Sequence, residues 1–165
     1  MSVPLTSPTV IRLSTMKDAR QLMQLDQLVW NHLNTPSVFY CSSRRQYLQA
    51  CPPGSQLVAV QGEQICGYVG FGYPQSFTVS QHVYDIHIAV HPDYRRQGIA
   101  GRLLDELCDY ACTQHIRKLT LRVLSTNTEA VQFYDKYGFV ENGRLQEQFY
   151  IHGRYVDDIL MTYWL

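Results

Sequence analysis

Residues 88–101 read Ile-Ala-Val-His-Pro-Asp-Tyr-Arg-Arg-Gln-Gly-Ile-Ala-Gly, and they join the end of an apolar strand to the beginning of a long helix. Gly98 stands where that helix is expected to begin. A helix N-terminus leaves backbone N–H groups unpaired and carries a partial positive charge. A glycine there lets an anion approach the backbone without meeting a Cβ. Three arginines surround the turn: Arg95, Arg96 and Arg102. The turn is therefore either a site for phosphate oxygens or an ordinary turn with solvated cations.

Strand-like and helix-like patterns alternate along the rest of the chain. Strands are expected at Val10–Ser14, Gln56–Val60, Gln64–Tyr73, Val83–Val90, Lys118–Leu124, Phe139–Tyr150 and Tyr155–Trp164. Helices are expected from a capping box at Thr15 and Asp18 to about Trp30, and over Arg44–Ala50, Gly98–Thr113 and Asn127–Tyr137. This order, β-α-α-β-β-β-α-β-α-β-β, predicts an α/β domain with parallel and antiparallel pairs in one sheet.

Length and composition set limits on the class of protein. The chain has 165 residues, of which 45% are hydrophobic, and no segment looks like a linker, so we expect one domain over residues 1–165. Its 14 Lys and Arg balance 14 Asp and Glu, which argues against nucleic acid or an anionic membrane as the main partner. No apolar run approaches the roughly 20 residues of a membrane span, and Met1–Leu5 do not resemble a signal peptide.

The cysteines favour a cytoplasmic protein. Five is an odd number, and their irregular spacing suits reduced thiols better than a disulfide framework. Cys108, Cys112 and His115 have helical spacing, but no fourth ligand lies nearby in the sequence, so no metal site is expected.

Two common phosphate-binding motifs do not fit the sequence. The chain contains no G-x-x-x-x-G-K-[ST] segment, so a nucleotide-hydrolysing P-loop is unsupported. The glycines of Gly67–Gly72 occur in the reverse order to the dinucleotide fingerprint and lie inside an expected strand. We expect them to mark a strand that another backbone or a ligand approaches closely.

Three segments carry a family resemblance when they are taken together. Arg95-x-x-Gly98-x-Ala100 is followed by Asn127-x-x-Ala130-x-x-Phe133-Tyr134-x-x-Tyr137-Gly138-Phe139 and by Gly153–Met161. They resemble the [Q/R]-x-x-G-x-[G/A] motif, the second signature and the closing hairpin of the GCN5-related N-acetyltransferase (GNAT) superfamily. The resemblance covers nearly the whole chain. It implies a mixed sheet of about seven strands, splayed between strands four and five and flanked by about four helices.

The resemblance also implies an enzyme that transfers an acetyl group from acetyl-coenzyme A to a primary amine by direct attack in a ternary complex, without a metal. Backbone groups of Ile88 and Val90 would meet the pantetheine arm at the splay, and N–H groups from Arg96 to Gly101 would hold the pyrophosphate. Asn127 would contact the pantetheine arm or cap its helix, and Tyr134 would be the general acid. The implied cofactor-binding set is Ile88, Ala89, Val90, Arg95, Arg96, Gln97, Gly98, Ile99, Ala100, Gly101, Asn127, Ala130 and Tyr134.

The general base is left open, because the sequence departs from the family here. Many members carry a glutamate on the central strand or on the strand before the second signature, whereas this chain has Tyr84 and Arg122 there. Asp85 and His87 titrate, but side chains alternate across a strand, so they should point away from the cofactor side. The candidates are Tyr84 with a water relay, or a residue of the N-terminal helices.

The acceptor is equally open between a small-molecule amine and a protein amine. Aromatic and polar residues of several segments could line its pocket or belong to the core: Trp30, Asn31, Phe39, Tyr40, Tyr73, Tyr150 and Tyr155. Asp26 and the pair Asp157–Asp158 could attract a cationic amine, although exposed carboxylates are usually only solvated. The aromatic C-terminal strand could mediate a homodimer. Two alternatives to the enzyme remain, a coenzyme A-binding sensor without turnover and a structural domain that binds another anion.

Overall fold

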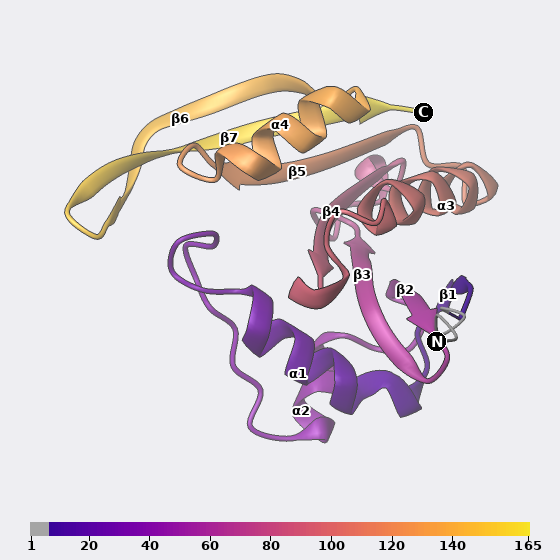
Figure 1. The fold of residues 1–165 in the computed structure, drawn as a ribbon. Coiled ribbons are helices and arrows are strands. Elements are labelled where there is room, and N and C mark those ends of the chain that lie inside the picture. The colour runs from indigo at the N-terminus through magenta and orange to yellow at the C-terminus, as the bar shows by residue number, and fades with distance from the viewer. Residues whose placement is uncertain (1–6) are drawn as a thin grey trace. The chain divides into compact units, whose positions relative to one another are not determined.

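The computed structural model describes residues 7–165, so Met1–Leu5 and the expectation about a signal peptide lie outside the described residues. Seven strands form one sheet in the order β1-β2-β3-β4-β5-β7-β6 (Figure 1). The strands are β1 (Thr9–Leu13), β2 (Gln56–Gln61), β3 (Gln64–Gly72), β4 (Val83–Val90), β5 (Lys118–Leu124), β6 (Val140–Ile151) and β7 (Arg154–Trp164). The helices are α1 (Ala19–Val29), α2 (Arg44–Ala50), α3 (Ile99–Thr113) and α4 (Thr128–Tyr137). Short 3-10 turns lie at Met16–Asp18, Thr78–Ser80 and Pro92–Tyr94.

The sheet confirms the predicted mixture of strand directions. β4 and β5 are parallel, whereas β1 with β2, β2 with β3, β5 with β7 and β6 with β7 are antiparallel. The ladder between β4 and β5 joins Val83–Asp85 to Lys118–Thr120. Because no later residue of β4 pairs with β5 within residues 7–165, the predicted splay between strands four and five is confirmed.

The chain divides into two compact units. The first comprises residues 7–29, Cys41–Gly70 and Ile88–Leu107. In it the Tyr68 hydroxyl donates to Oδ1 of Asp26 on α1 at 2.5 Å. A Cβ on the neighbouring Gly67 would lie 3.4 Å from Ile99 Cγ2 on α3. Since neighbouring side chains leave a strand on opposite faces, α1 and α3 cover the two faces of β3.

Gly67 shows why β3 is rich in glycine. A Cβ at this position would lie 2.8 Å from the carbonyl oxygen of Ala89 on β4, closer than side-chain carbons come to backbone oxygens. Any other residue would therefore push the two strands apart. The expectation that these glycines mark a close approach of another backbone is confirmed at this position.

The second unit comprises Trp30–Tyr40, Phe71–His87 and Cys108–Leu165. Alternate residues of β5 are buried: Leu119, Leu121 and Val123. On this face α4 runs along the sheet, with the rings of Tyr137 and Tyr163 5.4 Å apart (Figure 1). Thr120 and Arg122 of β5 point to the opposite face, which is polar.

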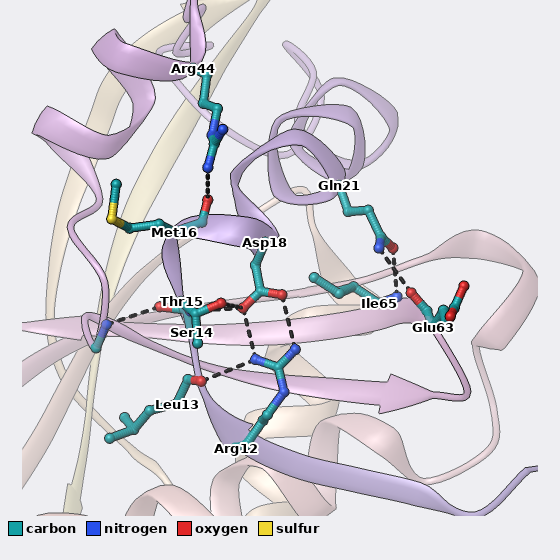
Figure 2. A network of polar contacts seen from close by, with 11 residues as sticks. Arg12, Leu13, Ser14, Thr15, Met16, Asp18, Gln21, Arg44, Glu63 and Ile65 are labelled. Carbon is teal, nitrogen blue, oxygen red and sulfur yellow. Dashed lines mark hydrogen bonds and ion pairs between the residues drawn. The ribbon is translucent and has the colours of Figure 1, made fainter.

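The start of the first helical segment is fixed by a closed polar network (Figure 2). The carboxylate of Asp18 accepts hydrogen bonds from the Thr15 backbone N–H at 2.7 Å and from the Thr15 hydroxyl at 3.2 Å. Arg12 adds bonds from Nη1 to Oδ2 at 2.7 Å and from Nη2 to Oδ1 at 2.9 Å. The predicted capping box at Thr15 and Asp18 is confirmed, and its carboxylate lies almost fully inside the protein.

Within residues 7–165, none of the helices combines the length and apolar content that crossing a bilayer requires. The five cysteines form no disulfide within this part of the chain. The cytoplasmic location stays a prediction.

Candidate active site

The turn between β4 and α3 uses two residues with left-handed backbone conformation. After the 3-10 turn Pro92–Tyr94, the φ angle is +61° at Arg96 and +74° at Gly98. The His91 side chain accepts a hydrogen bond from the Asp93 N–H at 3.1 Å, which holds the first part of the turn. Such alternation of backbone conformation curls successive N–H groups around a common point and makes an anion-binding concavity.

The N–H groups of this turn are not used by the described protein. The six from Arg96 to Gly101 donate to no atom within residues 7–165, and the first helical bond runs from the Arg102 N–H to the Gly98 carbonyl at 3.1 Å. A Cβ built on Gly98 or on Gly101 would meet nothing within 4 Å. The backbone here is accessible, and its free donors suit a diphosphate.

The arginines around the turn differ in their availability. Arg95 and Arg96 are exposed, and their side chains make no hydrogen bond within residues 7–165, although the Arg95 backbone N–H donates to the Pro92 carbonyl at 3.4 Å. Arg102, by contrast, donates from Nη2 to the carbonyl oxygen of Thr9 on β1 at 3.0 Å. The sequence placed all three near the anion, whereas the structure already engages Arg102 with β1.

At the end of β4 one backbone edge lies beyond the pairing with β5. The His91 N–H donates to the Cys66 carbonyl of β3 at 2.7 Å. Because strand residues direct their N–H and C=O groups to alternate edges, those of Ile88 and Val90 point away from β3. These groups lie beyond Asp85, where the pairing with β5 has ended. They are available to a ligand with its own amides.

The second signature forms the start of α4. Asn127 accepts a hydrogen bond from the Ala130 N–H at 3.4 Å, so its predicted capping role is confirmed. Tyr134 is buried, with its ring centroid 5.2 Å from that of Phe133 and 5.4 Å from that of Phe139. Burial raises the pKa of Tyr134, because the phenolate is poorly solvated there. The hydroxyl therefore keeps its proton at neutral pH, as a proton donor must.

Tyr84 of β4 lies beside two other aromatic residues. Its ring centroid is 5.1 Å from that of Phe71 and 5.6 Å from that of Tyr73, and only 6% of the residue is exposed. Burial raises the pKa of Tyr84 to about 12. At neutral pH its hydroxyl is protonated, so the predicted role in proton removal would require a water relay.

The opposite side of the same strands carries a group of polar residues, which we call the Arg122 face: Asp85, His87, Thr120, Arg122 and Asp158. Thr120 Oγ1 lies 3.4 Å from Asp85 Oδ1, in agreement with their paired positions in the ladder. Nε of Arg122 donates to Oδ2 of Asp158 at 2.7 Å, and Nη2 donates to the same oxygen. The His87 ring lies 6.2 Å from that of Trp30.

Desolvation shifts the pKa values of two groups on the Arg122 face, each in the direction that favours the uncharged form. Desolvation raises the pKa of Asp85, although the hydrogen bond from Thr120 and the charge of Arg122 partly oppose the rise. Desolvation lowers the pKa of His87 and so favours its neutral form. A neutral imidazole at pH 7 can accept a proton.

The carboxylates that sequence reasoning offered to a cationic amine are already paired. Asp158 is only 3% exposed and is held by Arg122, and Asp26 accepts from Tyr68. Asp157 accepts from Arg144 Nη1 at 2.9 Å and from the Glu147 N–H at 2.8 Å. The expectation of solvated carboxylates is wrong for Asp158, because the register of β5 with β7 brings it beside Arg122.

The aromatic residues proposed for the acceptor pocket all belong to the second unit. Phe39, Tyr40 and Tyr73 are exposed, and so are Tyr150 and Tyr155, whose rings lie 5.0 Å apart in the last hairpin. Their contact with an acceptor stays a prediction, and so does the homodimer.

Comparison with known proteins gives a consistent assignment. Residues 20–139 match the model of the acetyltransferase (GNAT) family. The L-amino acid N-acetyltransferase AaaT of Escherichia coli K12 is 28% identical over 94% of this chain and 98% of its own length. The spermidine N(1)-acetyltransferase of Vibrio cholerae is 38% identical over 44% of this chain. That match spans 43% of the relative's own length. The match to the ribosomal protein bS18-alanine N-acetyltransferase of Escherichia coli K12 spans 59% of the length of that enzyme.

Solved structures show the same fold. The Streptococcus mutans UA159 protein smu.2055 superposes with a TM-score of 0.83 and 33% identity, covering 93% of this chain and 98% of the other. The Salmonella typhimurium protein yncA, a putative acetyltransferase solved with its cofactor acetyl-CoA, gives a TM-score of 0.82 at 20% identity over 96% and 95% of the two chains. The predicted superfamily and fold are confirmed, and this chain belongs to the acetyltransferase (GNAT) family.

Proposed function

We propose that the protein is an N-acetyltransferase that moves an acetyl group from acetyl-coenzyme A to a primary amine by direct attack in a ternary complex. The observation that carries this proposal is the turn from Arg96 to Gly101, whose six N–H groups have no acceptor within residues 7–165. Family membership and the whole-length similarity to an amino acid N-acetyltransferase support it.

In this proposal the diphosphate of acetyl-coenzyme A binds the N–H groups of Arg96, Gln97, Gly98, Ile99, Ala100 and Gly101, next to Arg95. The backbone of Ile88, Ala89 and Val90 offers hydrogen bonds to the pantetheine amides. Asn127 and Ala130 stay joined by the capping bond at the start of α4. Bound acetyl-coenzyme A supplies an activated acyl group as a thioester.

The chemistry follows from the charges that the transfer creates. An alkyl amine has an ordinary pKa of about 10.4, so it must first lose a proton. Its lone pair then attacks the thioester carbonyl, and an N–H group near Val90 stabilises the negative oxygen. The C–S bond breaks as the C–N bond is completed, and the departing sulfur takes a proton from the Tyr134 hydroxyl. The nitrogen loses a second proton to solvent as it becomes an amide, and solvent returns a proton to Tyr134. Tyr84 would serve proton removal through a water relay.

The direct test follows free thiol release while the protein is incubated with acetyl-coenzyme A and a panel of primary amines. Thiol release that depends on an amine supports the enzyme. Tight acetyl-coenzyme A binding without release for any amine would instead identify a sensor, and the absence of any binding would leave only an anion-binding domain.

Gly98→Glu tests the diphosphate turn. The added carboxylate would occupy the space beside the free N–H groups, so acetyl-coenzyme A affinity should fall at least about 100-fold by calorimetry. Gly54→Glu is the matched control, because Gly54 also has a positive φ, +83° against +74°, and also has open space at its Cβ. Gly54→Glu should leave the affinity unchanged. Equal losses in both variants would remove the turn from the proposal.

Tyr134→Phe tests the acid. It removes one hydroxyl and keeps the ring contacts with Phe133 and Phe139, so kcat should fall by about 10- to 100-fold while the Kd for acetyl-coenzyme A stays the same. A parallel loss of turnover and affinity would instead assign Tyr134 to packing.

A further inference from the structure

We infer that Arg122 recognises a carboxylate of the acceptor, so that the amine acetylated by this protein belongs to an α-amino acid with a free carboxyl group. The inference rests on the proposed function, since it names the acceptor of the same reaction. It is carried by the donors of Arg122, by the fixed position of its guanidinium and by the residues on the same side of the sheet.

Arg122 has donors to spare. A guanidinium carries five N–H groups, and this one uses Nε and Nη2 on a single oxygen, Oδ2 of Asp158. The Arg122 side chain makes no other hydrogen bond within residues 7–165, and 55% of it is exposed. The Nη1 group is therefore free to donate to a second carboxylate. Arginine is the side chain best suited to this task, because its planar donors match the two oxygens of a carboxylate.

The guanidinium is held in place. The Asp158 side chain is only 4% exposed, and its carboxylate anchors Arg122 from within the sheet. The two residues lie on neighbouring strands, where Arg122 of β5 is opposite Leu160 and Asp158 comes two residues before Leu160 in β7. An arginine already fixed by a buried partner loses little conformational freedom when it binds a ligand.

The residues beside Arg122 suit the other end of an amino acid. Thr120 is opposite Asp85, and Arg122 follows on the same side of β5, as His87 does on β4. Asp85 offers a carboxylate to the ammonium group. A positive and a negative side chain on one face thus match the two charges of a zwitterion. A polyamine would instead place a second cation next to the guanidinium.

The test compares acceptors that differ only in the carboxylate. L-Phenylalanine, L-phenylalaninamide and 2-phenylethylamine share the ring, as L-methionine and L-methioninamide share the thioether. We expect kcat/KM for each acid to exceed that of its amide by about 10- to 100-fold, the range of a charge-assisted hydrogen bond. The α-amino nitrogen is less basic in the amides than in the acids, so the amides would react faster if the enzyme did not recognise the carboxylate. A preference for the acids therefore shows that the carboxylate is recognised.

Two variants connect the preference to Arg122. Arg122→Gln should lower kcat/KM for the acids until it matches that for the amides, with the loss mainly in KM. Because this change leaves Asp158 buried without its partner, Arg122→Gln with Asp158→Asn provides a second variant that removes both charges and keeps the shape of the buried side chain. The Kd for acetyl-coenzyme A is measured for each variant and should not change. Calorimetric binding of L-phenylalanine in the presence of coenzyme A gives a readout that does not need turnover.

The outcomes separate this inference from the proposed function. A wild-type protein that acetylates amides and 2-phenylethylamine as well as the acids overturns the inference and leaves the enzyme in place. A preference that both variants retain also overturns it. Arg122-dependent binding of L-phenylalanine without thiol release supports the carboxylate site and removes the proposed activity. If no acid binds or reacts, the inference fails.

Discussion

Two arginine–aspartate pairs occur in similar surroundings and are used differently. In the first unit, Asp18 is bonded to both terminal nitrogens of Arg12 and to two groups of Thr15. In the second unit, the Asp158 carboxylate is bonded to Arg122 alone within residues 7–165. Both carboxylates are nearly buried, with 6% and 4% of the side chain exposed, and both arginines are about half exposed.

The two pairs differ in whether the arginine keeps unused hydrogen-bond donors. Arg12 also donates to the Leu13 carbonyl at 3.1 Å, so its terminal nitrogens and the Asp18 carboxylate act within one closed network (Figure 2). Arg122 directs two donors to one oxygen and keeps its Nη1 group unused. A closed network stabilises the start of a helix, whereas an anchored guanidinium with spare donors is suited to binding. Hydrogen-bond completeness, rather than burial, distinguishes the two roles.

The largest effect is expected when each arginine is replaced by methionine. Arg122→Met leaves the Asp158 carboxylate buried without a donor and should lower the free energy of unfolding by about 2–3 kcal/mol. Arg12→Met should cost only about 1 kcal/mol, because Asp18 keeps both bonds from Thr15. Urea denaturation of the two variants measures the difference.

A second substitution tests whether the unpaired Asp158 carboxylate causes the loss of stability in Arg122→Met. Asp158→Asn in the Arg122→Met background should recover more than half of the lost stability, whereas Asp18→Asn added to Arg12→Met should destabilise further, since it weakens the capping bonds. If Arg12→Met costs as much as Arg122→Met, the two pairs are equivalent and the distinction fails.

The two pairs also show what can be predicted from sequence. Thr15 and Asp18 are three residues apart, and the capping pattern is local, so the helix start was predicted correctly. Arg122 and Asp158 are separated by 36 residues, and only the register of β5 with β7 brings them together. Register depends on the packing of whole strands, which one sequence does not reveal. The sequence pattern therefore identified Arg122 as a departure from the family, but it did not identify Asp158 as the partner of Arg122.

The same contrast holds for the rest of the fold. Element order followed from hydrophobic periodicity and from glycine and proline positions, and every predicted strand and helix occurs. The turn before α3 was predicted because its signal lies within consecutive residues. The Arg122 face was missed because Asp85 and His87 were judged by strand alternation alone. Alternation correctly placed them opposite Tyr84, but it could not say that Thr120 and Arg122 share their side.

A smaller effect is expected from pH, and it belongs to the closed pair. Hydrogen bonds from Arg12 hold the pKa of Asp18 below its ordinary value of 3.8. A lowered carboxyl pKa contributes stability above pH 3.8 and loses it as the pH falls through the folded-state pKa. Asp18→Asn should therefore cost about 1 kcal/mol at pH 6 and progressively less toward pH 3, as measured by urea denaturation across this range. A constant difference between the two proteins would mean that the Asp18 charge adds nothing.

The smallest effect separates charge from geometry in the open pair. Arg122→Lys keeps a cation beside Asp158, so the free energy of unfolding should change by less than about 1 kcal/mol. A lysine ammonium that is paired with Asp158 cannot also present a planar pair of donors to a second carboxylate. The KM for amino acid acceptors should therefore rise by about 3- to 10-fold at unchanged acetyl-coenzyme A affinity, as steady-state kinetics would show. Arg12→Lys is the matched control and should leave the KM as it is. If Arg122→Lys also leaves the KM unchanged, the spare donors of Arg122 serve no ligand, and the two pairs differ only in their contribution to folding.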